Sequence, residues 1–148
     1  DRYVYENMPH VKNRPEIFGQ QPILNGADEQ VGEEENLLLV SSFIGVDQVV
    51  SLTGEYGGVA FPAHVNRDSY SVIASLGAIP PEAGFTAAEV TRDCGLEAFQ
   101  VLHPELAGLS IFRSSDAHYL ESLAGDPWSI SLPERSAAAV LNAVRGFY

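Results

Sequence analysis

The sequence predicts an α/β fold in which short strands alternate with helices. Val59–Ala63 is a short apolar run of the kind that is buried in a parallel sheet. Glu134–Val144 places its apolar residues on one helical face, and Gly57-Gly58 ends an earlier helical pattern. Short loops between such elements favour parallel βα units, arranged as an open sheet or a barrel. The 148 residues fit a single domain, with a connector and hairpin over residues 1–36 and βα units over residues 37–148.

The first part of the chain contains a short helix and a β-hairpin in this prediction. Asp1–Met8 has the pattern of a helix end that Pro9 stops. Two strands flank Asn25-Gly26, a pair that readily takes the positive φ values of a tight turn. The acidic run Glu33–Glu35 is better explained as a solvated segment than as a metal site, because consecutive carboxylates point in different directions.

The remaining elements follow from apolar periodicity and from glycine and proline positions. Helices are predicted at the spacing of Val46, Val49, Val50 and Thr53, over Ser69–Leu76, over Leu96–Leu102 and over Glu134–Val144, with a helical turn over Ala117–Leu123 and Pro133 in the last helix's first turn. Strands are predicted over Val59–Ala63, Phe85–Val90, Leu109–Phe112 and Trp128–Leu132.

Charge and composition restrict the classes of partner. Twenty acidic residues against eight Lys and Arg give a net charge of −12, which argues against non-specific nucleic-acid binding. A small phosphate ester held by a metal ion remains compatible with this charge. No run approaches the roughly 20 apolar residues of a membrane span. The chain begins at Asp1 without a signal-peptide pattern, so we expect a trimmed or cleaved chain, and the single Cys94 favours a reducing cytoplasm.

Three residues that follow predicted strands are candidates for chemistry. His64 comes directly after Val59–Ala63, where a lone histidine is more often structural than a ligand or base. Asp116 and His118 are two residues apart, so an extended segment would turn both to one side. Carboxylate and imidazole suit Mn, Fe or Zn. Asp-x-His also occurs by chance, so this pair alone leaves both interpretations open.

The combination of motifs resembles a known family. The segment 57–64, a Gly-Gly turn, an apolar strand and Ala63-His64, resembles a motif of the PHP (polymerase and histidinol phosphatase) family of metal-dependent phosphoesterases. Ser114–His118 resembles that family's closing Ser-Asp-Ala-His. The segments 13–19 and 76–89 are also similar to a subset of PHP phosphohydrolases, so the resemblance covers nearly the whole chain.

The resemblance implies a fold and a set of metal ligands. PHP proteins form a distorted seven-stranded βα barrel with up to three divalent metals at its C-terminal rim, and this chain is similar to the barrel's C-terminal part. His64, Asp116 and His118 would each be a ligand of a different metal, which would be Zn, Mn or Fe. Arg67 and Arg113 flank the two motifs, where a guanidinium can contact a substrate phosphate or pair with a local carboxylate.

The rest of the family's ligand set does not occur in this sequence. No His-x-His is present, and the family's bridging Glu and further ligands precede the matched segment. We therefore expect phosphoester hydrolysis of a small substrate by the intact protein, and an incomplete site in this chain alone. The alternative is a degenerate, non-catalytic PHP module that completes itself by forming a homo-oligomer at its open sheet edge.

Overall fold

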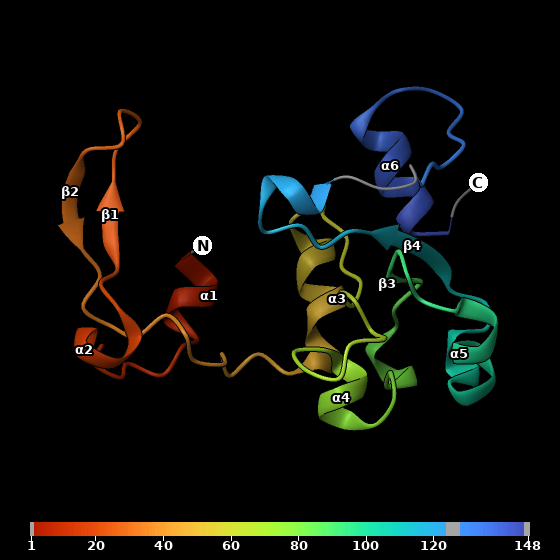
Figure 1. The fold of residues 1–148 in the computed structure, drawn as a ribbon, viewed down its shortest axis with the longest axis horizontal. Helices are drawn as coiled ribbons and strands as arrows, with labels where there is room; N and C mark the ends of the chain where they lie inside the picture. Colours follow the sequence, from red (N-terminus) through yellow and green to blue (C-terminus); the bar gives the residue numbers. More distant parts are fainter. Residues whose placement is uncertain (1, 124–127, 147–148) are drawn as a thin grey trace. The chain divides into compact units, whose positions relative to one another are not determined.

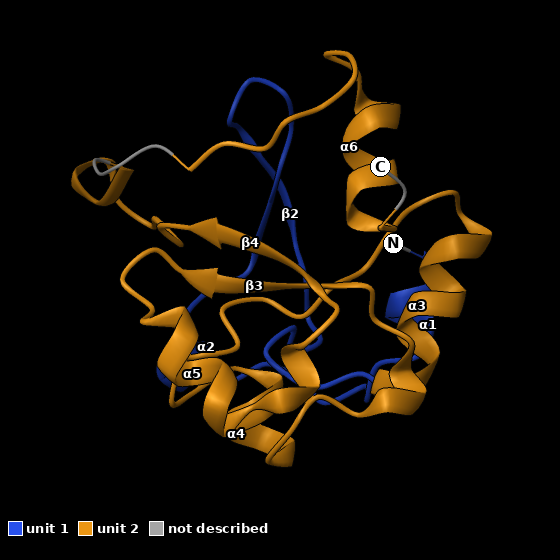
Figure 2. Cartoon of the chain, turned by 90° about the vertical axis from the view of Figure 1, so that its right-hand side faces the viewer, with its two compact units in different colours: residues 1–45 blue, residues 46–148 orange. Residues whose placement is uncertain are grey.

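The protein has a mixed α/β fold with two small sheets. A computed structural model describes residues 2–123 and 128–146, and the chain divides into two compact units, residues 1–45 and 46–148 (Figures 1 and 2). Each sheet has two strands, and the strands of the described residues do not close a barrel. No helix in the described ranges has the length and apolar character needed to cross a membrane.

The first unit contains the hairpin that the sequence predicts. Asn25 shapes the turn, since its side-chain oxygen accepts hydrogen bonds from the backbone N–H groups of Ala27 and Glu29. Asp28 has a φ of 60°, in the left-handed region that such turns use. The elements are α1 (Arg2–Glu6), α2 (Pro15–Phe18) and the antiparallel strands β1 (Pro22–Leu24) and β2 (Gln30–Glu33).

The second unit is built around a parallel pair of strands. β3 and β4 pair in parallel from Ala87 opposite Ser110 to Thr91 opposite Ser114, which confirms the parallel arrangement predicted for these two strands. α5 and α6 lie on opposite sides of this pair (Figures 1 and 2). The elements are α3 (Val46–Glu55), α4 (Val72–Leu76), η1 (Pro81–Ala83), β3 (Ala87–Thr91), α5 (Leu96–Leu102), η2 (Pro104–Leu106), β4 (Ser110–Ser114), η3 (Leu120–Leu123) and α6 (Ala137–Val144).

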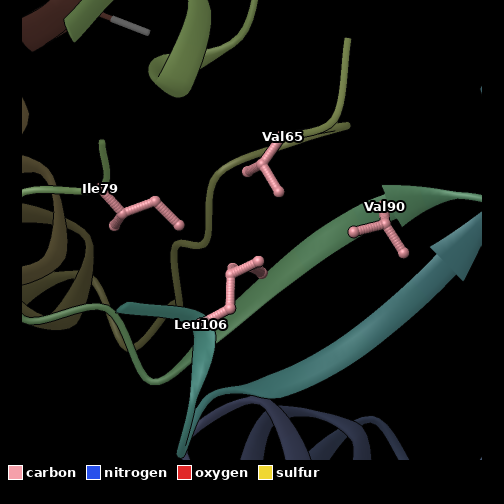
Figure 3. Close-up of a cluster of buried hydrophobic side chains, with 5 residues drawn as sticks. Val65, Ile79, Val90 and Leu106 are labelled. Atoms are coloured by element: carbon pink, nitrogen blue, oxygen red, sulfur yellow. The ribbon is translucent and has the colours of Figure 1, made fainter. Parts of the chain in front are cut away.

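A small hydrophobic cluster covers one face of this sheet. Side chains alternate along a strand, so Ala88 and Val90 of β3 share the face against which Leu106 and Val65 pack. Leu106, Val65 and Val90 are the largest fully buried side chains of the described residues. Ile79 completes the cluster, which Figure 3 shows beside β3. Burying side chains of this size contributes about 1.5–3 kcal/mol each.

The opposite face of the sheet carries a helix and an aromatic group. Thr86 donates its hydroxyl to the Val144 carbonyl at 2.7 Å, which fixes the end of α6 beside the start of β3. Farther along, the ring of Phe112 stacks on Phe61 at 5.4 Å and contacts Trp128 at 5.3 Å between centroids. This face therefore combines helix packing at one end with aromatic packing near the middle of β4.

The segment Val59–Ala63, predicted as a strand, does not form one. Pro62 has no N–H, so it can only accept: its carbonyl takes the Glu89 N–H at 2.9 Å, and Val65 returns an N–H to the Glu89 carbonyl at 2.8 Å. These two bonds hold the segment against β3 without a regular ladder. It thus lies beside β3, whose other neighbour is β4.

Two helices begin later than the sequence pattern predicts, and a last strand is missing. α4 starts at Val72 and α6 at Ala137, because Ser71 and Ser136 act as N-caps and accept the N–H groups of Ala74 and Ala139. Pro133 therefore precedes α6. Residues 128–132 form no strand, and Trp128 contacts β4 through its ring.

Candidate functional site

Four of the five candidate residues are linked at the C-terminal end of the β3–β4 pair. Arg67 donates its backbone N–H to the His64 carbonyl at 2.9 Å, and its Nη2 lies 3.0 Å from Asp116 Oδ2. His118 Nδ1 lies 2.8 Å from the Asp116 carbonyl. Both motifs that carry the family resemblance thus meet at one edge of the sheet, where parallel α/β sheets place their ligand sites.

The loop that carries His64 is attached to the end of β3. Asn66 donates from Nδ2 to the Thr91 hydroxyl at 2.7 Å and accepts the Thr91 N–H through Oδ1 at 2.8 Å. This pair of bonds continues, through a side chain, the backbone bonds that Val65 and Pro62 make to Glu89. His64 is thereby held in a fixed position with respect to the sheet.

His64 has two unusual features for a structural histidine. Its φ is 33°, a left-handed conformation that costs a residue with a side chain about 1–3 kcal/mol and is enriched at functional sites. Its Nδ1 is buried and has no hydrogen-bond partner within the described residues. A buried nitrogen without a partner costs about 1–3 kcal/mol, and a metal ion or a water molecule would satisfy it.

Asp116 lies two residues beyond β4 and also has a left-handed backbone. Its φ is 48°, and its N–H donates to the Ser114 hydroxyl at 3.3 Å. Ser114 in turn donates to Glu89 Oε1 on β3 at 2.6 Å. The Asp116 carboxylate is therefore aimed by a short chain of bonds from the sheet, and its side chain is 21% exposed.

The hydrogen bond of His118 determines which of its nitrogens can bind a metal. A carbonyl oxygen only accepts, so the Nδ1 that lies against the Asp116 carbonyl carries the proton. The lone pair then resides on Nε2. Metal-binding histidines commonly have this arrangement, in which the second nitrogen donates to a carbonyl or carboxylate and orients the ring.

The ion pair between Arg67 and Asp116 positions groups and adds little stability. The Arg67 side chain is 46% exposed, and exposed pairs contribute about 0–1 kcal/mol. Its effect is to hold a guanidinium beside the carboxylate that follows β4. A guanidinium in that place offers further N–H donors to an oxyanion.

A polar hollow of about 690 Å³ lies next to Arg67. Its described lining comes from the loops that follow His64, β3 and β4, together with η3. Asp93, part of this lining, has its pKa lowered from 3.8, first by a hydrogen bond from the Thr91 hydroxyl and then by its own backbone N–H, with smaller contributions from Arg92 and Arg67. Asp93 is thus an ionised acceptor at neutral pH.

Arg113 is not brought to this edge group. Its Nη1 donates to the carbonyls of Arg92 at 3.0 Å and Cys94 at 3.2 Å, and it lines a separate hollow with Cys94 and Gly95. Burial raises the pKa of the Cys94 thiol, while the Arg113 charge opposes that rise. In this structure Arg113 fixes the loop between β3 and α5.

The donor types at the edge fit the metals that the resemblance implies. One carboxylate and two imidazoles, those of Asp116, His64 and His118, are ligands for Zn, Mn or Fe. Within residues 2–123 and 128–146, no group of three or more His, Cys, Asp or Glu side chains is arranged to hold a metal ion. The fit is therefore one of chemistry and of individual atoms, namely Nδ1 of His64 and Nε2 of His118.

Sequence reasoning missed the last residue of β3 and the two residues that follow it. Thr91, Arg92 and Asp93 line the hollow, and Thr91 links Asn66 to Asp93. The rule that ligands bind beyond the carboxyl ends of parallel strands applies to them as it does to His64. Placing the end of β3 at Thr91, one residue past the predicted Val90, would have drawn attention to them.

Comparisons of the chain with models of protein families, with curated proteins and with solved structures find no match. The PHP resemblance consequently depends on the motifs themselves and on the edge at which they meet.

Proposed function

We propose that the chain is the C-terminal part of a PHP-type metal-dependent phosphohydrolase, which hydrolyses a small phosphorylated substrate in the intact protein. The observation that carries the proposal is the 3.0 Å ion pair between Arg67 and Asp116, because it joins the His64 motif to the Ser-Asp-Ala-His motif. On this proposal β3 and β4 belong to a seven-stranded barrel. The single Cys94 agrees with a cytoplasmic location.

Each edge residue has a role in the proposed reaction. His64, Asp116 and His118 would hold divalent Zn, Mn or Fe, which supplies an activated water and neutralises phosphate charge when bound. His118 presents Nε2, since Nδ1 donates to the Asp116 carbonyl. Arg67 orients a phosphate oxygen by donating N–H groups, while the ion pair to Asp116 keeps the guanidinium in place.

The proposal includes an incomplete site in this chain alone. Metal affinity comes from several ligands that converge in fixed geometry, and here His64, Asp116 and His118 would each serve a different metal. The family's His-x-His does not occur in the sequence. We therefore expect no robust turnover of a phosphomonoester by the purified chain with Mn.

Metal binding tests the ligand assignment directly. Titration of the purified chain with Mn or Zn, followed by calorimetry, is expected to show weak binding that His118→Ala and Asp116→Asn each reduce by about tenfold or more, as loss of a metal-orienting group does. His10→Ala is the matched control, because His10 is exposed and belongs to the first unit. Equal affinities for the wild type and the His118 variant would refute the assignment.

Turnover tests the second part of the proposal. Robust hydrolysis of a generic phosphomonoester by this chain, abolished by His118→Ala, would show that its site is complete and would overturn the expected inactivity. Hydrolysis that survives His118→Ala would point to another site or to a contaminating phosphatase.

A second candidate function is a non-catalytic module that self-associates. The observation that favours it is that β4 pairs with β3 alone among the described strands, so it is an edge strand of its sheet. A second copy could pair there. Sedimentation at several concentrations distinguishes the two: a stable dimer without metal-dependent turnover favours the module, and a monomer rules out this form of it.

A further inference from the structure

The hollow beside Arg67 is lined by polar side chains. The nine described side chains that line it are all polar: two guanidiniums, three carboxylates, one amide and three hydroxyls. Ligand sites more often have mainly apolar walls with a few polar groups. A lining in which every side chain carries a polar group indicates a ligand whose own surface is largely hydrophilic.

The positive groups account for one part of such a ligand. Arg67 and Arg92 only donate hydrogen bonds, and they lie just beyond the first motif and beyond β3. Ser115, which follows β4, adds a hydroxyl that makes no hydrogen bond within the described residues. Guanidiniums and hydroxyls at the ends of three neighbouring segments suit a phosphate group.

The negative groups require a different part. Asp68, Asp93 and Glu121 line the same hollow, and ionised carboxylates only accept hydrogen bonds. A phosphate is repelled from them, so the ligand atoms that face them must donate. Hydroxyls meet this requirement, and they also match the Ser122 hydroxyl, which both donates and accepts. An ammonium group would donate to the carboxylates, but it could not accept a hydrogen bond from the Ser122 hydroxyl.

No aromatic side chain lines the described part of the hollow. A phenyl ring therefore gains no contact with another ring there, and it has no hydrogen-bond donor for the carboxylates. The rings of Phe61, Phe112 and Trp128 pack on one another, and none of them lines the hollow.

We propose that the hollow binds the hydroxyl-rich organic part of a sugar phosphate or polyol phosphate, with its phosphate toward Arg67 and its hydroxyls toward Asp93 and Glu121. This inference rests on the proposed function for the identity of the phosphate-bearing substrate. It adds the substrate class, and it predicts weaker binding of aryl phosphates, whose rings have no donor for the carboxylates.

Calorimetry on the whole chain tests the proposal with three probes: inorganic phosphate, glucose 6-phosphate and phenyl phosphate. A hydrogen bond to a charged group is worth about tenfold in affinity, so we expect glucose 6-phosphate to bind at least tenfold more tightly than the other two. Phenyl phosphate binding as tightly as the sugar phosphate, or no binding of any probe, would overturn the inference.

Glu121→Gln assigns the preference to the hollow. The variant keeps the size of the side chain and replaces an acceptor-only group, so glucose 6-phosphate should lose about threefold to tenfold in affinity, while the affinity for inorganic phosphate should not fall. Glu55→Gln is the control, since it removes the same charge from the exposed end of α3. An equal shift for all three probes, or none, contradicts the assignment.

Binding separates this inference from the proposed function. A preference for the sugar phosphate without metal-dependent hydrolysis in any form of the protein would refute the phosphohydrolase and leave the inference standing. Hydrolysis together with equal binding of sugar and phenyl phosphates would refute this inference and leave the proposed phosphohydrolase standing.

Discussion

Asn66 is the residue that most directly connects the candidate site to the sheet. Its amide both donates to the Thr91 hydroxyl and accepts the Thr91 N–H, and Thr91 is 7% exposed. Removing the Asn66 amide leaves the buried Thr91 N–H without a partner. We expect Asn66→Ala to lower the free energy of unfolding by about 1–3 kcal/mol, measured by urea denaturation.

Asn66→Asp is the informative companion variant, because it keeps the acceptor for the Thr91 N–H, loses the donor to the Thr91 hydroxyl and adds a negative charge near Asp68 and Asp93. Its loss of unfolding free energy should be smaller than that of the alanine variant. An aspartate variant as destabilised as Asn66→Ala would show that the bond to the Thr91 N–H is not enough to hold the loop.

Thr91 should also control the protonation of Asp93. Its hydroxyl is the largest cause of the lowered pKa of Asp93, so Thr91→Val is expected to raise that pKa toward 3.8. A lowered folded-state pKa contributes stability above the unfolded value, and this contribution is lost as the pH falls through the folded pKa. The wild type therefore loses it as the pH falls below about 3.9, and Thr91→Val, whose folded pKa approaches the unfolded value, has less of this contribution to lose.

Carboxyl-carbon chemical shifts measured against pH report the Asp93 pKa without any assumption about stability. Thr86→Val is the control, since its hydroxyl donates to the Val144 carbonyl and not to Asp93. An unchanged Asp93 titration in Thr91→Val would show that the backbone N–H and the arginines, and not the hydroxyl, set the pKa of Asp93.

At the scale of elements, the end of α3 is fixed by a close contact at Gly58. A Cβ there would lie 2.8 Å from Thr53 Cγ2, and the Thr53 rotamer is held because its hydroxyl donates to the Val49 carbonyl at 2.6 Å. We expect Gly58→Ala to lower the midpoint of thermal unfolding, through overpacking worth about 1–3 kcal/mol.

Gly54→Ala is the matched control, with the opposite sign. Gly54 is within α3, and a Cβ there meets nothing within 4 Å. Replacing a helical glycine by alanine stabilises by about 0.5–1 kcal/mol. If both variants shift the midpoint in the same direction, the contact with Thr53 does not determine how α3 ends.

Sequence patterns predicted the elements that local chemistry defines. The hairpin around Asn25-Gly26 and helix α5 occur where periodicity and turn residues placed them, and the strands β3 and β4 occur within two residues of their predicted bounds. The strand predicted over Val59–Ala63 is wrong, because Pro62 has no N–H and His64 has a left-handed backbone conformation. The segment is therefore attached to β3 by two backbone hydrogen bonds and forms no regular ladder with it.

The candidate site could be predicted in position but not in its connections. Strand ends indicated where His64 and Asp116 would lie, since parallel strands share an edge. The ion pair of Arg67 with Asp116 and the bonds of Asn66 to Thr91 join residues distant in sequence, and no local pattern encodes them. The position of the Arg113 side chain could not be predicted for the same reason, because its partners are backbone carbonyls of a loop distant in sequence.

At the scale of the molecule, the two compact units differ in how much they bury. In the described part of residues 1–45 only Asn13 and Leu37 are buried, whereas the second unit has the cluster around Leu106. Local stability follows buried apolar contact, so amides of the first unit should exchange with solvent faster.

Leu106→Ala tests whether the second unit unfolds by itself. Leu106 is fully buried, so its truncation should cost about 2–5 kcal/mol through lost burial and the cavity left behind. Leu102→Ala, at a position 75% exposed, should change stability by about 0.5 kcal/mol or less. Hydrogen exchange should then speed up in β3, β4 and α5, with the hairpin of β1 and β2 unchanged. Faster exchange in that hairpin as well would mean that one cooperative transition includes both units, because a local loss in the second would then lower the protection of the first.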